Sequence, residues 1–458
     1  MIYAEHISDF GLGLTLEQIP EALRTRIKGS ILDTLGVCLV SSHLDYAGMV
    51  AEYVLDAAGR DEATVIGWGK RVPMANAALA NGSFAHGLDF DDSHNPSRTH
   101  PSSCVVPAAL AVCEATGASG RSLLEAVVVG LESMTRIAMA GVSFDKGGVN
   151  TEGFHQRWIH PTILCGIFGA ALSASKLLKL DVQHSSWALG LAGGMASGSF
   201  EYLAEGTWGK RIGPGWAAHG GLIAAQLAAK GFSGPRTVFE GKAGLFRSRL
   251  REDNYDLNQL VMGLGTKWQA LSIGVKRFPC CHRNHAQIES ALALRSKHGI
   301  VVSEIDAVEC IVDRLAVELV CEPWAKKLRP QNEYAAKFSL PYCVAAALVK
   351  GRVSIHEFDA GVVGDEDILR LAMKMTYTVD EKLDPAEVPG GVKIRMKNGD
   401  VFEALKEQDS FAEWPEIRAK FMENTSQKLG DVAAARVAGM VERIEELPDV
   451  RDLMRQCA

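Results

Sequence analysis

The sequence lacks the marks of several protein classes. Its ten cysteines form no Cys-x-x-Cys pair, and a chain of 458 residues does not depend on disulfides, so this usage is typical of a reducing compartment. It has no long run of Lys or Arg, and its formal net charge of −7 does not supply the concentrated basic field of a nucleic-acid or anionic-membrane surface. The opening residues MIYAEHISDF have no basic region and no apolar core, so we expect no secretory signal and a cytoplasmic location.

Uninterrupted apolar stretches of membrane-spanning length are also missing. The most apolar run, residues 160–178, is rich in Gly, Ala and Ser and contains Lys176, which favours a buried helix of a soluble protein over a membrane span. We see no internal repeat and no low-complexity linker. With 47% hydrophobic residues, the chain is apolar enough to fold and long enough for two or three domains.

Helical periodicity dominates the first part of the chain. Apolar residues recur at helical spacing from about residue 15, where Thr15 and Gln18 form a plausible capping box and Pro20 is expected in the first turn. Predicted helices over 161–178, 186–198 and 216–230 are full of Gly and Ala. Because small residues let backbones approach closely, we expect these helices at the centre of a bundle.

The pattern changes near residue 268. Alternation over 305–313 predicts a half-buried strand, and further strands are expected at 373–379, 392–396 and 401–404, the last two joined by an Asn398-Gly399 turn. Helices are expected over 286–298 and 339–351, and the helical period returns from 409. We therefore predict a mainly α protein with a large all-helical domain, residues 1–267 and 409–458, and a smaller α+β domain, residues 268–408.

The densest polar cluster spans residues 86–103. Three carboxylates and three imidazoles within fifteen positions are typical of acid/base catalysis or of hard-metal binding, and a solvated loop with capping aspartates is the alternative. A metal is disfavoured because neither an HExxH motif nor the turn glycine of an EF-hand loop is present. The candidate residues are His86, Asp89, Asp91, Asp92, Ser93, His94, Arg98 and His100.

Two further clusters adjoin the Gly/Ala-rich helices. His155 and His160 precede the helix at 161–178, where the N-terminal end of a helix favours a carboxylate ligand and keeps a nearby imidazole neutral; a capping histidine is the alternative. Lys210 and Arg211 lie in a Gly-rich turn and are suited to anchoring carboxylates, unless the turn is simply a solvated basic one.

Two weaker signals lie in the α+β part. His282 or His285 in KRFPCCHRNHAQIE is a candidate acid/base or carboxylate-binding group, because the adjacent cysteines suit a metal poorly. Tyr342 begins a predicted helix near Lys337, and its phenol is either catalytic or part of the packing.

Taken together, these segments resemble the MmgE/PrpD family, which includes 2-methylcitrate dehydratase, cis-aconitate decarboxylase and iminodisuccinate epimerase. The resemblance runs in order over nearly the whole chain. It is carried by ILDTLGVCLVSS, ANGSFAHGLDFDDSH, THPSS, HPTILCGIFGAALSASKLLKLD, EGTWGKRIGPGWAAHGGLIAAQLAAKGFSGP, FEGKAGLF, KRFPCCHRNHAQIESAL and AAKFSLPYCVAAAL. It implies a helical domain, a smaller α+β lid and a site in the cleft between them.

The resemblance also implies roles for individual residues. The expected catalytic residues are Asp89, Ser93, His100, His160, Lys210, His285 and Tyr342, and the expected substrate-binding residues are Arg211, His155 and His86. Two departures stand out. The loop from Asp89 to His100 is one residue longer than in the decarboxylase branch. The residues QRWI separate His155 from His160, so either of the two can correspond to the family's histidine at the start of this helix.

The family works without a metal or an organic cofactor, and its members move a proton at a carbon next to a carboxylate. We therefore expect a cofactor-independent lyase that eliminates water from a 2-methylcitrate-like hydroxy polycarboxylate. Epimerisation of an iminodisuccinate-like dicarboxylate is the alternative, followed by a cis-aconitate-type decarboxylase or a catalytically silent relative. The expected partners are a small polycarboxylate and a second copy of the chain in a homodimer, with no nucleic acid and no membrane.

Overall fold

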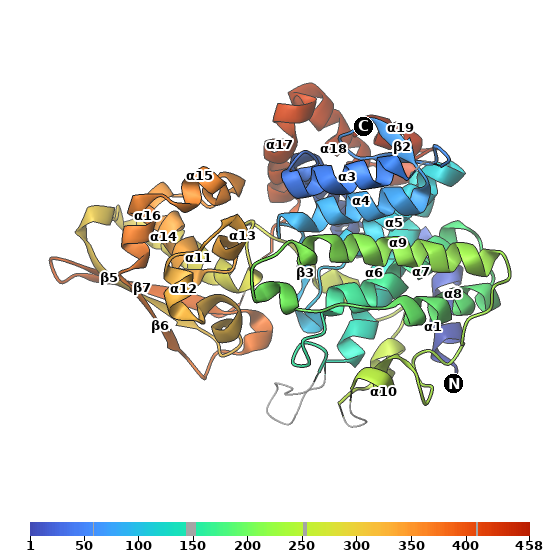
Figure 1. The fold of residues 1–458 in the computed structure, drawn as a ribbon, viewed down its shortest axis with the longest axis horizontal. Coiled ribbons are helices and arrows are strands. Elements are labelled where there is room, and N and C mark those ends of the chain that lie inside the picture. The colour runs from blue at the N-terminus through green and yellow to red at the C-terminus, as the bar shows by residue number, and fades with distance from the viewer. Residues whose placement is uncertain (58, 143–152, 251–253, 409–410) are drawn as a thin grey trace.

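The computed structural model describes the whole chain except residues 58, 143–152, 251–253 and 409–410. It consists of a large helical body and a smaller lid, residues 278–408, which lie side by side (Figure 1). The helices of the body are α1 (Tyr3–Gly13), α2 (Glu21–Ser41), α3 (Asp45–Asp56), α4 (Met74–Gly87), α5 (Ser102–Thr116), α6 (Gly120–Ala140), α7 (Pro161–Leu177), α8 (Val182–Met195), α9 (Gly209–Ala229), α10 (Leu245–Arg249), α17 (Trp414–Leu429), α18 (Asp431–Glu442) and α19 (Arg451–Arg455).

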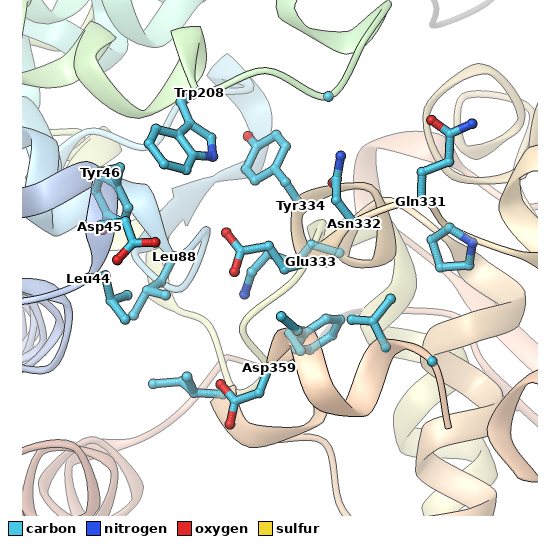
Figure 2. Close-up of a pocket in the computed structure, with 18 of the residues that line it drawn as sticks. Leu44, Asp45, Tyr46, Leu88, Trp208, Gln331, Asn332, Glu333, Tyr334 and Asp359 are labelled. Atoms are coloured by element: carbon cyan, nitrogen blue, oxygen red, sulfur yellow. The ribbon is translucent and has the colours of Figure 1, made fainter. Parts of the chain in front are cut away.

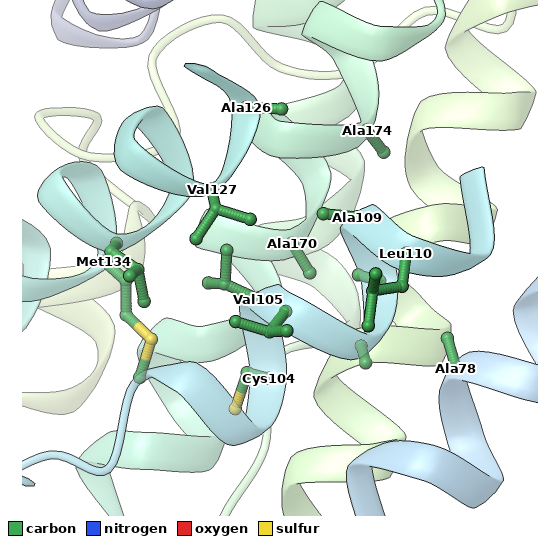
Figure 3. Close-up of a cluster of buried hydrophobic side chains, with 14 of the residues drawn as sticks. Ala78, Cys104, Val105, Ala109, Leu110, Ala126, Val127, Met134, Ala170 and Ala174 are labelled. Carbon is green, nitrogen blue, oxygen red and sulfur yellow. The ribbon is translucent and has the colours of Figure 1, made fainter. Parts of the chain in front are cut away.

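Of the three Gly/Ala-rich helices predicted at the centre, α7 is buried over nearly its whole length, whereas α8 and α9 each keep some exposed residues. Helix α9 packs against α4, α7 and α8. At the crossing of α4 and α9, a Cβ atom added to Gly82 would lie 2.7 Å from the Cα atom of Gly215, so the two backbones are too close for any side chain. Figure 3 shows how small side chains such as Ala170 and Val105 fill the space between the neighbouring helices. The small residues thus permit the close packing of the helices that carry the site.

The start of α2 differs from the prediction. Gln18 Oε1 accepts a hydrogen bond from the backbone N–H of Thr15 at 2.8 Å, but the turn it closes is a separate 3₁₀ turn, Leu16–Gln18. The helix begins afterwards at Glu21, and Pro20 occupies its N-cap position instead of a place inside the first turn. The extended backbone at Thr15 and Ile19 separates the two elements.

The lid is built on a four-stranded sheet. Its strands are β5 (Ile305–Val312), β6 (Met375–Val379), β7 (Gly390–Met396) and β8 (Val401–Lys406), in the order β6-β5-β7-β8, with β5 parallel to β6 and antiparallel to β7. Helix α11 (His285–His298) packs on β7 and β8, and α14 (Leu340–Lys350) packs on α11. The other lid helices are α12 (Trp324–Leu328), α13 (Glu333–Lys337), α15 (Ala360–Val363) and α16 (Glu366–Ala372).

The two largest hydrophobic cores follow this division, and Val37, Leu88 and Phe90 form a small third cluster. The first joins side chains between residues 4 and 275 to side chains between 412 and 457, so the C-terminal segment returns to the body, where α17 packs against α2. The second contains lid side chains between 278 and 396 together with Phe200 and Tyr202. The expected boundary at 268 lies close to the point where the cores change, and the one at 409 lies outside the described residues.

Short strands hold the polar cluster in place. Besides the hairpin of β1 (Ala63–Val65) and β2 (Lys70–Val72), strand β3 (Asp92–His94) pairs antiparallel with β4 (Ile273–Val275), which directly precedes the lid. The cluster predicted from residues 86–103 is therefore anchored to the junction between body and lid. In the described part of the chain, none of the helices has the length and apolar character needed to cross a membrane.

Candidate active site

A cavity of about 810 Å³ lies between the body and the lid. The loop around β3, the segment before α7 and the start of α9 line it from the body. The segments after β4, β5 and β6 line it from the junction and the lid. The structure brings six predicted site residues together here: Asp89, Ser93, His100, His155, His160 and Lys210.

The backbone around this cavity is strained. Among the described residues, five that are not glycine have φ between 51° and 58°, in the left-handed region. Four of these five line the cavity: Asp89, Arg98, Trp158 and Val388. A left-handed conformation costs a non-glycine residue roughly 1 to 3 kcal/mol and is concentrated at functional sites. The position of the strain therefore supports a functional role for the cavity independently of any motif.

Asp89 lies between two lysines. Its Oδ1 is 2.7 Å from Nζ of Lys210, at the start of α9, and 3.2 Å from Nζ of Lys276, which also donates to the Asp89 carbonyl at 3.0 Å. All three side chains are buried. Burial alone would raise the pKa of Asp89, but the two ammonium groups hold it well below its ordinary value. The group thus carries two positive charges and one negative charge, and its surplus positive charge suits an anionic ligand.

His100 is held in one tautomer. Its Nδ1 lies 2.8 Å from the carbonyl oxygen of Asp92 and 3.1 Å from Oγ of Ser93, so Nδ1 carries the hydrogen and Nε2 is left as the acceptor. The backbone N–H of His100 donates to Oγ1 of Thr162 in the first turn of α7, which fixes the loop to that helix. Burial, followed by the charges of the two lysines, lowers the pKa of His100 well below its ordinary value. In the free protein it is therefore a neutral imidazole that can accept a proton.

Both candidate histidines before α7 reach the cavity. His160 is the N-cap residue of α7, and its ring packs on Phe200 at a centroid distance of 4.7 Å; His155 packs on Phe200 at 4.8 Å. Burial, followed by the charge of Lys210, lowers the pKa of His160 well below its ordinary value. Burial, followed by the charge of Arg98, lowers the pKa of His155 to about 3. His160 thus lies nearer the lysine group, and His155 nearer Arg98.

His86, one of the expected substrate-binding residues, does not line the cavity. Its ring is buried behind the site, 5.3 Å from the ring of His100 and 6.2 Å from that of His160, measured between centroids. Its Nδ1 lies 2.6 Å from Oδ2 of Asp91. Although burial would raise the pKa of Asp91, the charge of His86 lowers it to about 2. The His86–Asp91 pair therefore lies where it can hold the rings of His100 and His160 in position.

Arg211 faces a neighbouring cavity instead of this one. Although it follows Lys210 directly, its guanidinium binds Glu333 at 2.7 Å and lies over the rings of Tyr46 and Trp208. Figure 2 shows this second cavity, of about 710 Å³, with Trp208 and Tyr46 on the body and Glu333 and Asp359 on the lid. Successive residues of a helix point in different directions, so Lys210 and Arg211 cannot both serve the first cavity.

The two expected lid residues lie inside the lid and do not line the first cavity. The ring of His285, at the start of α11, packs edge-on against His282 and Phe278, with centroid distances of 4.9 and 5.2 Å. The hydroxyl of Tyr342 donates to the carbonyl of Glu357 at 2.5 Å, and the side chain is fully buried. The lid instead contributes Cys281, His282, Phe338 and a segment after β5 that includes Arg314 and Leu319 to the cavity, and Lys276 lines it from the residues between β4 and the lid.

Sequence reasoning did not select several residues that line the cavity. Lys276 is the first residue of the KRFPCCHRNH motif. Nothing else in the sequence indicated that its ammonium group is buried beside Asp89. Arg98 was part of the first polar cluster but received no role. Tyr202 had no signal in the sequence. In the described ranges, no three His, Cys, Asp or Glu side chains are grouped as a metal site would require.

Comparison with known proteins agrees with this architecture. The sequence model of the MmgE/PrpD N-terminal domain family matches residues 5–258, and that of the MmgE/PrpD C-terminal domain family matches residues 278–446. A cis-aconitate decarboxylase-like protein, oryM, of Aspergillus oryzae is 27% identical over 95% of this chain and 93% of its own length. The cis-aconitate decarboxylase of Mus musculus is 28% identical over 97% and 91%, and one of Aspergillus terreus is 27% identical over 86% and 82%. The chain belongs to the MmgE/PrpD family.

Proposed function

We propose that the protein is a lyase that removes CO2 from a cis-aconitate-like tricarboxylate. Decarboxylation was the third expectation from the sequence. It now comes first because the relatives described above, which match most of this chain, carry the name of that activity. Elimination of water from a 2-methylcitrate-like acid remains the second candidate, because the same groups can remove a proton next to a carboxylate.

The observation that carries the proposal is the buried group of Asp89, Lys210 and Lys276 beside neutral histidines. A small polycarboxylate needs cations that are fixed in advance, and it needs a proton carrier within reach of its carbon atoms. Lysine ammonium groups supply compact positive charge, and burial strengthens their interaction with an anion. The charge of Asp89 raises the pKa of Lys210, and its carboxylate holds both lysine side chains in place until the substrate arrives.

Decarboxylation places two demands on the cavity. As the bond between the methylene carbon and the departing carboxylate breaks, its electron pair forms a new double bond to the central carbon. The electrons of the old double bond move to the carbon next to a remaining carboxylate, which becomes enolate-like. A lysine ammonium near that carboxylate stabilises the developing charge, and the rings of Phe200 and Tyr202 in the cavity wall exclude water from the departing group.

The reaction is completed by a proton. The enolate-like carbon must be protonated, and His100 and His160 are the groups we assign to this step. Both are neutral in the free protein because burial and the lysines lower their pKa values. The negative charges of a bound tricarboxylate act in the opposite direction and raise the pKa of a neighbouring imidazole. Substrate binding thus prepares the imidazolium that the last step consumes.

Proton NMR in D2O tests the proposal. The purified protein is treated with a chelator and incubated with cis-aconitate, 2-methylcitrate, citrate and iminodisuccinate in separate tubes. Decarboxylation of cis-aconitate gives a pair of geminal vinyl signals and one deuterium in the new methylene group. A vinyl signal from a hydroxy acid instead identifies a dehydratase, and loss of an α-proton signal without net conversion identifies an epimerase. Silence with all four acids contradicts the proposed substrate class.

A further inference from the structure

Arg98 lies at the outer end of the site, and no residue that the structure describes forms a hydrogen bond or an ion pair with its guanidinium. It directly follows the 3₁₀ turn η2 (Asn95–Ser97) as its C-cap residue, with φ of 54°, and its backbone N–H bonds to the carbonyl of Asn95 at 3.1 Å. Its side chain lines the cavity.

A second guanidinium, that of Arg283, acts on Arg98. Burial, followed by the charge of Arg283, lowers the pKa of Arg98 to about 10. Asp313 is the nearby carboxylate, but it is already bonded to Arg283 at 2.8 Å and to the backbone N–H of Leu315. His155, which also faces Arg98, is neutral. A partly buried guanidinium that no described carboxylate bonds is suited to binding an anion from outside.

The cavity therefore has two positive ends. At the inner end, Lys210 acts on His160, and at the outer end Arg98 acts on His155. The two histidine rings pack on the same residue, Phe200, which lies between these ends. The lid closes over the outer end, because the turn η10 (Pro385–Glu387) contacts η2 and the next residue, Val388, lines the cavity.

We infer that Arg98 is a specificity-determining residue that binds the substrate carboxylate farthest from the reacting carbon. The planar guanidinium can hold a carboxylate through two parallel hydrogen bonds, which fixes both the distance and the orientation of the bound acid. The site then selects acids with carboxylates at both ends over acids that lack the outer one. This inference rests on the proposed function in one respect, namely that the substrate is a polycarboxylate.

The left-handed backbone at Arg98 supports the inference. A non-glycine residue in this conformation is strained, and glycine would relieve the strain. Arginine at such a position therefore has a role other than stabilising the turn. Its backbone geometry aims a long cationic side chain from the loop into the cavity.

The test is a binding experiment that needs no turnover. Isothermal titration calorimetry compares tricarballylate with 2-methylsuccinate, which lacks one terminal carboxylate. We expect the wild-type protein to bind tricarballylate about ten- to a hundredfold more tightly, the effect of one charge-assisted pair. In Arg98→Gln the two acids should bind with similar affinity, and the affinity for 2-methylsuccinate should change less than about threefold. Arg98→Lys should restore part of the preference for tricarballylate.

Two further variants act as controls. Arg314→Gln removes an exposed cation that lines the same cavity and should leave the ratio unchanged. Arg98→Gly relieves the backbone strain, so it should fold at least as stably as the wild type and still lose the ratio. An unchanged ratio in Arg98→Gln and Arg98→Gly overturns the inference, as does an equal loss in Arg314→Gln. If no acid is turned over but the ratio depends on Arg98, the proposed reaction fails and the role of Arg98 stands.

Discussion

The ammonium nitrogen of Lys210 lies 2.7 Å from Oδ1 of Asp89, and both side chains are buried. The two residues are 121 positions apart, and the pair joins the start of α9 to the end of α4. Lys276 contacts the same oxygen from the junction with the lid. Three segments of the chain therefore hold the charged group at the centre of the site.

Replacing Lys210 with methionine removes the inner cation and keeps most of the side-chain volume. We expect Lys210→Met to lower kcat/KM about 100- to 1000-fold, the usual effect of losing one group that stabilises developing charge. Lys337→Met is the matched control, because Lys337 is also buried but donates to the Pro279 carbonyl and lines the second cavity. Steady-state kinetics of both variants check the prediction. Equal losses in the two variants would speak against a direct role for Lys210.

Asp89→Asn leaves both lysines and removes the negative charge between them. The site then carries one more positive charge, so a polycarboxylate should bind more tightly while kcat falls about 100-fold, because the ammonium groups lose their fixed positions. Calorimetric binding of tricarballylate together with kcat separates the two effects. Weaker binding in Asp89→Asn would mean that Asp89 contacts the substrate favourably and would contradict its assignment as a positioning residue.

Asp91 and His86 should set the protonation of the cavity histidines. The charge of Asp91 raises the pKa of His100, so Asp91→Asn should move the alkaline limb of the kcat profile to lower pH by about half to one unit. Asp92→Asn is the control, because the Asp92 carboxyl is held by Ser102, whereas Asp91 is the carboxylate that raises the pKa of His100. The pH dependence of kcat from 5 to 9 is the measurement, and an unmoved alkaline limb in Asp91→Asn would contradict the effect of Asp91 on His100.

The sequence predicted those parts of the fold that local patterns determine. Alternation over 305–313 is the strand Ile305–Val312, and the Gly- and Ala-rich segments are closely packed helices because small residues are needed where Gly82 meets Gly215. Strand β3 was not predicted, since its partner β4 lies about 180 residues away and neither is long enough to show a period. Pairings of this range depend on the tertiary structure.

The motifs predicted which residues belong to a site, but they did not show in which direction each side chain points. Asp89, His100 and His160 meet in one cavity. Lys210 and Arg211 are adjacent in sequence but serve different cavities, because successive helical positions point apart. Tyr342 and His285 lie in the second hydrophobic core or against it, and a sequence does not show whether a buried polar side chain faces a cavity or a backbone carbonyl.

Tyr342→Phe tests this correction. The hydroxyl bonds to a backbone carbonyl within the lid, so its removal should destabilise the protein by about 1 to 2 kcal/mol and change kcat/KM less than about threefold. Tyr202→Phe, in the cavity wall, should lower kcat/KM more and stability less. Urea unfolding and steady-state kinetics on both variants give the comparison. A large loss of kcat in Tyr342→Phe at unchanged stability would restore its expected catalytic role.

Stability should fall between pH 6.5 and 5. Four histidines have pKa values lowered chiefly by burial, so below about pH 6.5 they bind protons in the unfolded chain and not in the folded one. These residues are His94, His100, His155 and His160. Burial raises the pKa of Asp33 to about 6 and that of Asp92 to about 7, and these two carboxyls act in the opposite direction.

The unfolded chain therefore binds about two more protons than the folded protein. The four histidines add about four protons to the unfolded chain, and the two carboxyls add about two to the folded protein. We therefore expect the free energy of unfolding to fall by about 2 to 3 kcal/mol per pH unit between pH 6 and 5. Urea unfolding at several pH values measures it. A stability that is constant or that increases toward pH 5 would show that the buried histidines are not neutral in the folded state.

The central claim is that the cavity around Asp89, Lys210 and Lys276 decarboxylates a small tricarboxylate. The most direct measurement is proton NMR of cis-aconitate in D2O with the wild-type protein and with Lys210→Met, after treatment with a chelator. The account predicts geminal vinyl signals and one deuterium per product molecule with the wild type, formed about 100- to 1000-fold more slowly by Lys210→Met. Unchanged cis-aconitate in both tubes, or equal rates in the two, would contradict it.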